Sequence, residues 1–261
     1  MGIKIGCLQF APQLLDFQVN IEKANNLLGN VRKGELDLLI LPEMCFSGYM
    51  FESKERIMPM VQKEKETIEW TTSTARRLHC CVQVGLPRQV GDGLCNSVCF
   101  AQPDGSVEFY DKHFLYEQDE HWATSGASFR SMRIQHLGNK KLGFGICMDV
   151  NPKAFEAPWD AYEFATFMSD NGAEILSLSM AWVWSPRSDP LNLAKYWVSR
   201  LEPLIMQNNS MVIIAIANRC GVESGTRFAG NSCVMKFEKG KANLLSILDE
   251  AEEALLLCNV E

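Results

Sequence analysis

The sequence feature that most constrains the fold is an apolar run that ends in a cysteine at a turn, Lys141-Leu-Gly-Phe-Gly-Ile-Cys147-Met-Asp149-Val-Asn-Pro152. Residues 142–146 are apolar and interrupted by glycine, which predicts a buried strand that Asn151-Pro152 cannot continue. A helical pattern at residues 161–168 and an apolar run at 175–180 follow. The order strand, sharp turn, helix, strand is typical of a nucleophile elbow, which lifts a side chain clear of the sheet. The alternative is that Cys147 is a small buried side chain closing a core strand.

The rest of the chain alternates strand patterns with one-faced helical patterns. Further helices are predicted at residues 20–33, 64–79 and 191–208, where apolar side chains recur at helical spacing. Further strands are predicted on both sides of residues 136–139 and at 3–10, 36–41, 81–86, 96–101, 107–110, 211–217, 231–237, 244–248 and 254–260. This order predicts an α/β (α+β) fold with a mixed sheet, outer helices and two similar βαβ halves. No Pro/Gly/Ser-rich or charged linker divides the chain, so we expect one domain over residues 1–261.

Composition excludes several classes of partner and cofactor. The formal net charge of -7 and the scattered basic residues argue against nucleic acid or an anionic membrane as a partner. No apolar stretch has the length of a spanning helix, and the first residues lack the pattern of a signal peptide. Ten cysteines without a C-x-x-C pair indicate reduced thiols in a cytoplasmic protein that could also enter the nucleus. The four histidines show no ligand spacing against those cysteines, so we expect neither a metal nor another cofactor.

Three polar side chains follow predicted buried strands. Glu43 comes after residues 36–41, Lys112 comes after residues 107–110, and Cys147 ends the apolar run. In open α/β sheets the crevice beyond the carboxyl ends of the strands is the usual place for chemistry. Taken singly, a glutamate after proline is typical of a solvated turn and a lysine in a polar stretch is typical of the surface. Together, a carboxylate, a cation and a thiol supply the functions that amide hydrolysis needs.

A thiol is only partly ionised near neutral pH, so it needs a base to take its proton as it attacks. Glu43 could serve as that base, with His113 or His121 as alternatives. Lys112 and the backbone N–H of Met148 could stabilise the oxyanion that forms. The protonated Glu43 could then donate its proton to departing ammonia and activate the water that hydrolyses the thioester.

Several ordered motifs carry a resemblance to a known family. Leu41-Pro-Glu43 with Gly48-Tyr49, then Tyr110-x-Lys112, then Gly145-Ile-Cys147-x-Asp149 resemble the three signature blocks of the nitrilase, or carbon-nitrogen hydrolase, superfamily. The resemblance implies a four-layer αββα sandwich and a triad of Glu43 as base and acid, Lys112 as oxyanion stabiliser and Cys147 as nucleophile. It also implies that Glu120, eight positions after the lysine, holds that lysine and orients the substrate. Glu117 competes for this role.

Within the superfamily, the segments after Cys147 are most similar to fungal-type protein N-terminal amidases, for example Tyr196-Trp-Val-x-Arg200. That similarity implies deamidation of N-terminal Asn or Gln on peptides and proteins, a step that feeds the arginine branch of N-degron degradation. Such an enzyme must hold a protonated α-amine. Asp149 is the acidic residue nearest to Cys147 in sequence, although it could instead brace the elbow. The other candidates are Asp16, Glu52, Asp119 and Glu120.

Two other functions stay open at this point. The first is a small-molecule amidase of the same family, such as an ω-amidase or a carbamoyl-amine hydrolase. An acid-lined pocket would favour the N-terminal amidase, and a basic clamp for a carboxylate would favour the small-molecule enzyme. The second is a binding or scaffold protein without activity, which the presence of Glu43, Lys112 and Cys147 together disfavours. We expect either a monomer or a homodimer.

Overall fold

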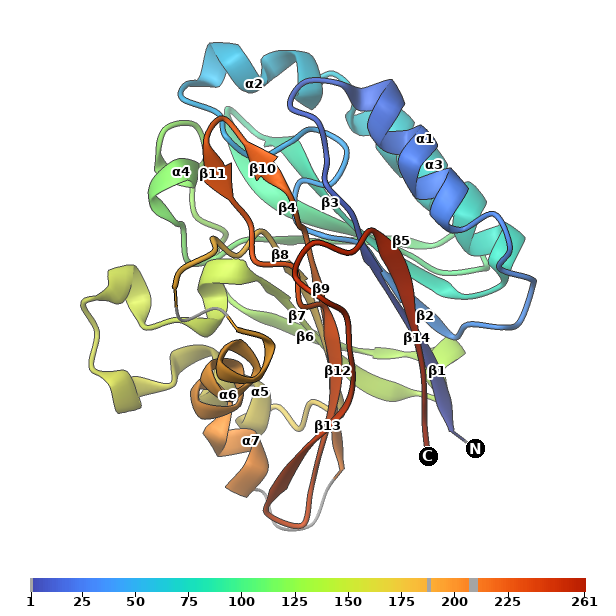
Figure 1. Cartoon of the computed structure of the whole chain (residues 1–261), viewed down its shortest axis with the longest axis vertical. Coiled ribbons are helices and arrows are strands. Elements are labelled where there is room, and N and C mark those ends of the chain that lie inside the picture. Colours follow the sequence, from blue (N-terminus) through green and yellow to red (C-terminus); the bar gives the residue numbers. More distant parts are fainter. Residues whose placement is uncertain (1, 187–188, 207–210) are drawn as a thin grey trace.

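The computed structural model describes residues 2–186, 189–206 and 211–261. Two six-stranded sheets pack against each other, and helices cover their outer faces, as Figure 1 shows. The predicted four-layer αββα sandwich is confirmed. The sequence patterns had indicated a mixed sheet, and the structure divides its strands between two sheets, because strand patterns do not show which strands pair.

The first sheet has the order β14-β1-β2-β3-β4-β5. Its parallel centre is formed by β1, β2 and β3, and the other neighbours are antiparallel. The strands are β1 (Ile3–Gln9), β2 (Leu38–Ile40), β3 (Cys81–Val90), β4 (Gly93–Ala101), β5 (Val107–Asp111) and β14 (Ala254–Val260).

The second sheet has the order β13-β12-β9-β8-β7-β6, with β7, β8 and β9 parallel. Its strands are β6 (Arg130–Ile134), β7 (Lys140–Ile146), β8 (Ile175–Met180), β9 (Val212–Asn218), β12 (Cys233–Glu238) and β13 (Lys241–Ile247). A small hairpin of β10 (Val222–Glu223) and β11 (Thr226–Arg227) lies outside both sheets.

Helices form the two outer layers. The first sheet is covered by α1 (Phe17–Leu27) and α3 (Glu64–Leu78), and the second by α5 (Glu163–Asp170), α6 (Pro190–Arg200) and α7 (Glu202–Met206). The shorter α2 (Lys54–Val61) and α4 (Glu117–Glu120) lie above the strand ends. No helix among the described residues is long and apolar enough to cross a membrane.

The helices differ from the predictions at two places. The expected helix at residues 191–208 is divided at Leu201 into α6 and α7, and its last two residues lie outside the described part of the chain. Pro203 explains the division, because it has no N–H to continue the hydrogen bonding of α6. The helix α2 was not predicted, since its eight residues include Pro59.

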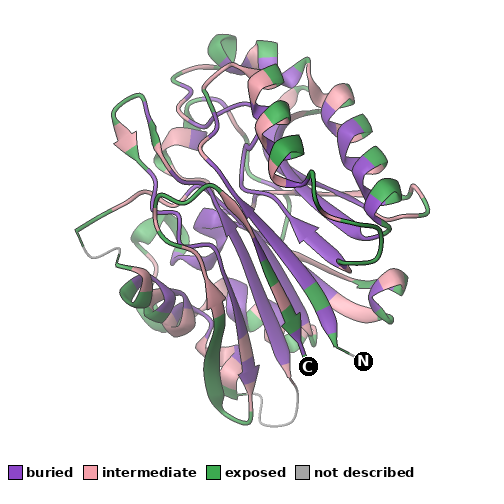
Figure 2. Cartoon of the chain, turned by 45° about the vertical axis from the view of Figure 1, so that its right-hand side comes forward, coloured by how far each residue is buried: buried purple, intermediate pink, exposed green. Residues whose placement is uncertain are grey.

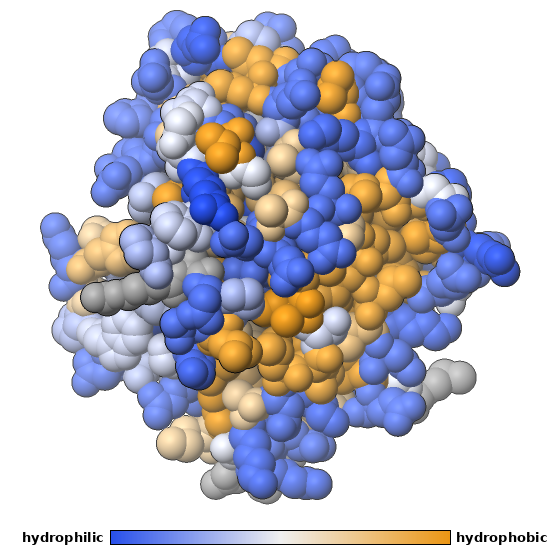
Figure 3. Space-filling model, in the orientation of Figure 1, coloured by the Kyte–Doolittle hydropathy of each residue, from blue (hydrophilic) through white to orange (hydrophobic). Residues whose placement is uncertain are grey.

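The core has two main layers. Alternate residues of β2 face opposite sides: Leu38 and Ile40 join the core between the sheets, whereas Leu39 packs against α1 and α3. Both faces of the sheet are therefore buried, which explains the continuous apolar runs of the sequence. Figure 2 shows the buried strands between helices whose outer faces are exposed. On the face shown in Figure 3, apolar residues gather mainly over the central strands and polar residues cover the helices.

Candidate active site

The nucleophile candidate Cys147 directly follows β7, at the start of a 3-10 turn spanning Cys147–Val150. Its φ of 36° lies in the left-handed region that side chains rarely adopt, as expected for a nucleophile elbow. Gly145, two residues earlier, leaves room for α5, because a Cβ there would lie 2.8 Å from the ring of Phe164. The apolar, glycine-broken strand of the sequence thus delivers the thiol to a sharp turn.

Asp149 braces this turn. Its carboxylate accepts hydrogen bonds from the N–H of Ile146 at 2.8 Å and from the hydroxyl of Tyr110 at 2.8 Å. It also accepts from the N–H groups of His113 at 3.2 Å and Phe114 at 2.9 Å. Four donors leave both oxygens engaged and the residue is fully buried, so the prediction that Asp149 binds the substrate amine is wrong. The alternative, a brace for the elbow, is confirmed.

Glu43 follows β2 in a loop that packs on the backbone of β3. A Cβ on Gly85 would lie 2.6 Å from both the Pro42 carbonyl oxygen and the Met44 nitrogen, so only glycine permits this approach. The loop is tied down further along by Glu223, whose carboxylate accepts from the N–H of Tyr49 at 2.7 Å. Glu43 is therefore held by backbone packing, and its side chain is fully buried.

Lys112 follows β5 and forms two buried ion pairs. Its Nζ donates to Glu43 Oε1 at 2.7 Å and to Asp119 Oδ2 at 2.5 Å, and all three side chains are fully buried. The prediction that Glu120 holds the lysine is wrong, and so is the alternative Glu117, because both residues are exposed.

The reason is the geometry of the four-residue helix α4. Asp119 Oδ2 accepts from the N–H of Tyr116 at 2.9 Å, which caps the helix and turns position 119 inward. Positions 117 and 120 lie three residues apart and consequently share the outer face.

Asn96 of β4 is a site residue that the sequence analysis missed. Its Nδ2 donates to Glu43 Oε1 at 2.6 Å and to Asp119 Oδ1 at 2.9 Å, so one amide bridges both carboxylates that flank Lys112. It is fully buried. The available signal was a polar side chain inside a buried strand, which needs hydrogen-bond partners.

Burial and charge set the protonation states of the triad. Burial, and to a smaller extent the charge of Glu43, raises the pKa of the Cys147 thiol well above its usual value, whereas Lys112 lowers it. The thiol is thus protonated at rest. Burial also raises the pKa of Glu43, against the opposing effect of Lys112. Burial alone would lower the pKa of Lys112, but the charges of Asp119 and Glu43 reverse the sign and raise it.

The protonation states of the triad are consistent with proton transfer from Cys147 to Glu43. Among the described residues, Oε1 of Glu43 has partners in Lys112 and Asn96, whereas Oε2 has none. A buried carboxylate oxygen without a donor is able to accept a proton, and a raised pKa improves a general base near neutral pH. The histidine alternatives fit less well, because His121 is exposed and His113 Nδ1 already contacts the carbonyl of Gly126 at 2.7 Å.

A cavity of about 600 Å³ opens beside Cys147. Small-molecule sites in proteins typically have volumes of roughly 300–1,000 Å³. No Asp, Glu, Lys or Arg is among the described residues that line it, so it shows neither the acidic lining nor the basic clamp that the sequence analysis considered. Its most frequent lining residues are aromatic: Tyr116, Phe155, Trp182, Trp184 and Tyr196. In the part of the chain that the structure describes, no group of three or more His, Cys, Asp or Glu side chains could hold a metal ion.

Comparison with known proteins gives consistent results. The carbon-nitrogen hydrolase family matches residues 4–257. A protein N-terminal amidase of Schizosaccharomyces pombe is 33% identical over 99% of this chain and 100% of its own length. An omega-amidase of Escherichia coli is 24% identical over 90% of this chain and 81% of its own.

Solved structures share the fold. The crystal structure of an N-terminal amidase with an Asn-Glu-Ala peptide has a TM-score of 0.85 at 20% identity, and the match covers 99% of this chain and 97% of the other. This likeness supports the sandwich architecture, while the family match over nearly the whole sequence gives the class of chemistry. The chain therefore belongs to the carbon-nitrogen hydrolase family and is a thiol-dependent amidase of that family.

Proposed function

We propose that the protein is a protein N-terminal amidase, which hydrolyses the side-chain amide of an N-terminal Asn or Gln to Asp or Glu and releases ammonia. The observation that carries the proposal is the thiol elbow of Cys147, which faces a 600 Å³ cavity with a carboxylate and a lysine buried behind it. The cavity exceeds what a side-chain amide alone needs, which leaves room for the peptide beyond it. The end-to-end match with the fission yeast N-terminal amidase supports the same substrate class.

The first half-reaction forms a thioester. Glu43 Oε2 takes the proton of the Cys147 thiol as the sulfur attacks the amide carbon. The negative charge that develops on the amide oxygen is stabilised by Lys112 Nζ and the N–H of Met148. When the tetrahedral intermediate collapses, the C–N bond breaks, and Glu43 donates the proton to the nitrogen, which departs as ammonia.

The second half-reaction restores the enzyme. Water enters the site that ammonia has left, and Glu43 takes one of its protons as the oxygen attacks the thioester carbonyl. Collapse of the second intermediate breaks the C–S bond, releases the carboxylic acid and returns the proton to Cys147. We assign Asp119 the role of keeping Lys112 charged and in place through both steps, because its carboxylate lies 2.5 Å from Lys112 Nζ and takes no part in the proton transfers.

The test is ammonia release from four peptides, confirmed by the mass shift of the product. The peptides carry N-terminal Asn, N-terminal Gln, the same Asn acetylated at its amine, and an internal Asn. Turnover of the first two alone, absent in Cys147→Ala, is the expected result. Hydrolysis of free glutamine analogues or carbamoyl amines, with no turnover of any peptide, would refute the proposal in favour of a small-molecule amidase.

The product places the reaction in a cellular context. An N-terminal Asp or Glu is the substrate class of the arginine branch of N-degron degradation, and we place the enzyme upstream of that step. A catalytic thiol and nine further free cysteines suit a reducing compartment, so we assign it to the cytoplasm or nucleus.

A further inference from the structure

An enzyme that acts on N-terminal residues must bind a cation close to its nucleophile. In Asn and Gln the α-nitrogen is only a few bonds from the side-chain amide carbon. When that carbon contacts the Cys147 sulfur, the α-ammonium group must lie in the inner part of the cavity. Binding a positive charge there requires a carboxylate, backbone oxygens or the faces of aromatic rings.

The acidic candidates from the sequence are all committed elsewhere or distant from the lining. Both oxygens of Asp149 brace the elbow, and Asp119 binds Lys112 and Asn96. Asp16 caps α1 by accepting from the N–H of Val19 at 3.2 Å. Glu52 and Glu120 are exposed and do not line the cavity. The seven residues outside the described part of the chain include no Asp or Glu.

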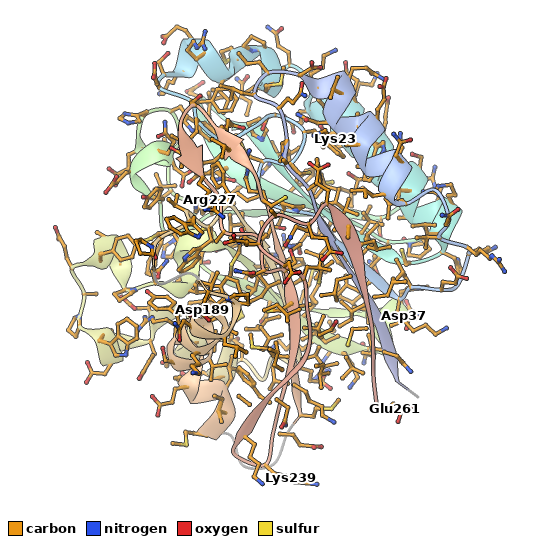
Figure 4. All side chains as sticks on the ribbon, in the orientation of Figure 1. Lys23, Asp37, Asp189, Arg227, Lys239 and Glu261 are labelled. Carbon is orange, nitrogen blue, oxygen red and sulfur yellow. The ribbon has the colours of Figure 1, made fainter. Side chains whose placement is uncertain are left out.

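Another carboxylate, that of Asp189, contacts a residue that lines the cavity. Asp189 precedes α6 and caps it, because its Oδ1 accepts from the N–H groups of Leu191 at 3.1 Å and Asn192 at 3.2 Å. Its other oxygen contacts the side chain of Asn192, which lines the cavity. Figure 4 shows Asp189 beside the start of this helix and Arg227 on the neighbouring hairpin. Asp189 is exposed and is not itself a lining residue, so it is the rival that an experiment must exclude.

Aromatic side chains line the cavity beside Cys147 instead. Tyr116, Trp182 and Tyr196 line the same cavity as Cys147. The ring of Trp182 lies edge-on to that of Tyr196, with centroids 5.4 Å apart.

Two hydrogen bonds restrain this part of the cavity. The hydroxyl of Tyr196 donates to Asn151 Oδ1 at 2.6 Å and holds the ring, whereas the backbone N–H of Trp182 donates to Asn218 Oδ1 at 2.9 Å and holds the main chain at that residue. The Tyr196 ring and the Trp182 backbone are therefore positioned before a ligand arrives, which lowers the entropy lost on binding.

We propose that Tyr116, Trp182 and Tyr196 form an aromatic box that binds the α-ammonium group of the substrate through cation–π contacts. The inference rests on the proposed function and specifies how its substrate is recognised. A cation over a desolvated aromatic face gains enough to change affinity by about tenfold or more. The box also explains how an amidase with no described charged residue in its cavity lining discriminates between N-terminal and internal amides.

The test measures how much the positive charge of the substrate α-ammonium group contributes to kcat/KM in the wild type and in each variant. One substrate is a peptide with N-terminal Asn, and the other is its desamino analogue, in which hydrogen replaces the α-ammonium group. The ratio of their kcat/KM values isolates recognition of the charge, because the reacting amide is the same. We expect a ratio of at least about ten in the wild type, and of about one to two in Trp182→Leu.

Two matched variants complete the design. Trp159→Leu removes an aromatic ring whose centroid lies 5.5 Å from that of Tyr196, and Trp159 does not line the cavity. The ratio should therefore stay at its wild-type value. Asp189→Asn removes the rival charge while keeping a good helix cap, and the ratio should again stay unchanged. Tyr196→Leu provides a second member of the box if Trp182→Leu does not fold, and its ratio should fall in the same way.

The outcomes separate this inference from the proposed function. A ratio that collapses in Asp189→Asn and persists in Trp182→Leu overturns the aromatic box but leaves the N-terminal amidase standing. An equal loss on both substrates in Trp182→Leu and in Tyr196→Leu assigns these rings to packing and also overturns it. Failure of the wild type on the N-terminal Asn peptide, with turnover of small amides, refutes the proposed function itself.

Discussion

Replacing Asp119 by Asn tests how Lys112 is held. Asn is isosteric with Asp, but the amide nitrogen that replaces one carboxylate oxygen cannot accept, so the hydrogen bond from either Lys112 or Asn96 is lost together with the negative charge. At 2.5 Å and an effective dielectric constant of about 20, a pair of unit charges attracts by about 7 kcal/mol. Desolvation offsets part of this, and breaking a buried pair costs about 3–5 kcal/mol. Lys112 still has its ion pair with Glu43 in this variant, so we expect the lower end of that range, a fall of about 3 kcal/mol in the free energy of unfolding.

The activity of Asp119→Asn should fall as well, and its pH profile should move. A displacement of Lys112 by about 1 Å would lower kcat/KM by about a hundredfold. The charge of Asp119 raises the pKa of Lys112 and adds to the burial that raises the pKa of Glu43. Its removal therefore lowers both pKa values. The acid limb of kcat/KM, where Glu43 becomes a base, shifts to lower pH, and the alkaline limb, where Lys112 loses its proton, shifts the same way.

The pH dependence of the free energy of unfolding should shift in the same direction as the pH profile of activity. A raised lysine pKa contributes stability that is present below the unfolded pKa and is lost as pH rises through the folded pKa. In Asp119→Asn this contribution should be smaller, and its loss should be complete at a lower pH than in the wild type. The assays are urea unfolding and ammonia release across pH, with the exposed Glu120→Gln as the matched control. An unmoved profile in Asp119→Asn, or an equal loss in Glu120→Gln, would refute the reasoning.

Two further substitutions test the parts that position Glu43. In Gly85→Ala the new Cβ meets the backbone around Glu43 at 2.6 Å, so kcat should fall by about a hundredfold while KM changes little; an unchanged kcat would contradict the proposed role of this contact. Asn96→Ala removes the amide that donates to both Glu43 and Asp119. We expect the free energy of unfolding, measured by urea denaturation, to fall by about 2–3 kcal/mol and kcat to fall as well. Wild-type values of both would show that water replaces the amide.

The elbow could be predicted because its determinants are local. A glycine-broken apolar strand followed by Asn151-Pro152 dictates a sharp turn wherever the chain folds, and the structure has Cys147 at that turn. The partner of Lys112 could not be predicted in this way. Its identity depends on which residue of a four-residue helix turns inward, and the Asp119 contact with the N–H of Tyr116 decides that. The family resemblance pointed to Glu120, which lies one residue further along the chain and is exposed.

Asn96 shows a different limit. Its position in a buried strand was visible in the sequence, but its two partners come from the loop that follows β2 and from the helix α4 that follows β5. The pairing of β2 with β3, of β3 with β4 and of β4 with β5 brings these segments together. A buried polar residue in a strand therefore signals that a partner exists, whereas the identity of the partner depends on the sheet order.

The rule that located Glu43 and Cys147 extends to the aromatic cavity. Both residues follow strands whose carboxyl ends meet at one side of the sandwich, where α/β proteins usually bind ligands. The strand β8 is parallel to β7 and ends at Met180, so Trp182 comes to the same side as the thiol. The next strand, β9, ends at Asn218, whose side chain accepts from the backbone N–H of Trp182. Adjacent parallel strands thus supply the nucleophile, an aromatic side chain and the group that holds the main chain at that residue, and strand-end residues in such a sheet identify the substrate pocket as well as the catalytic triad.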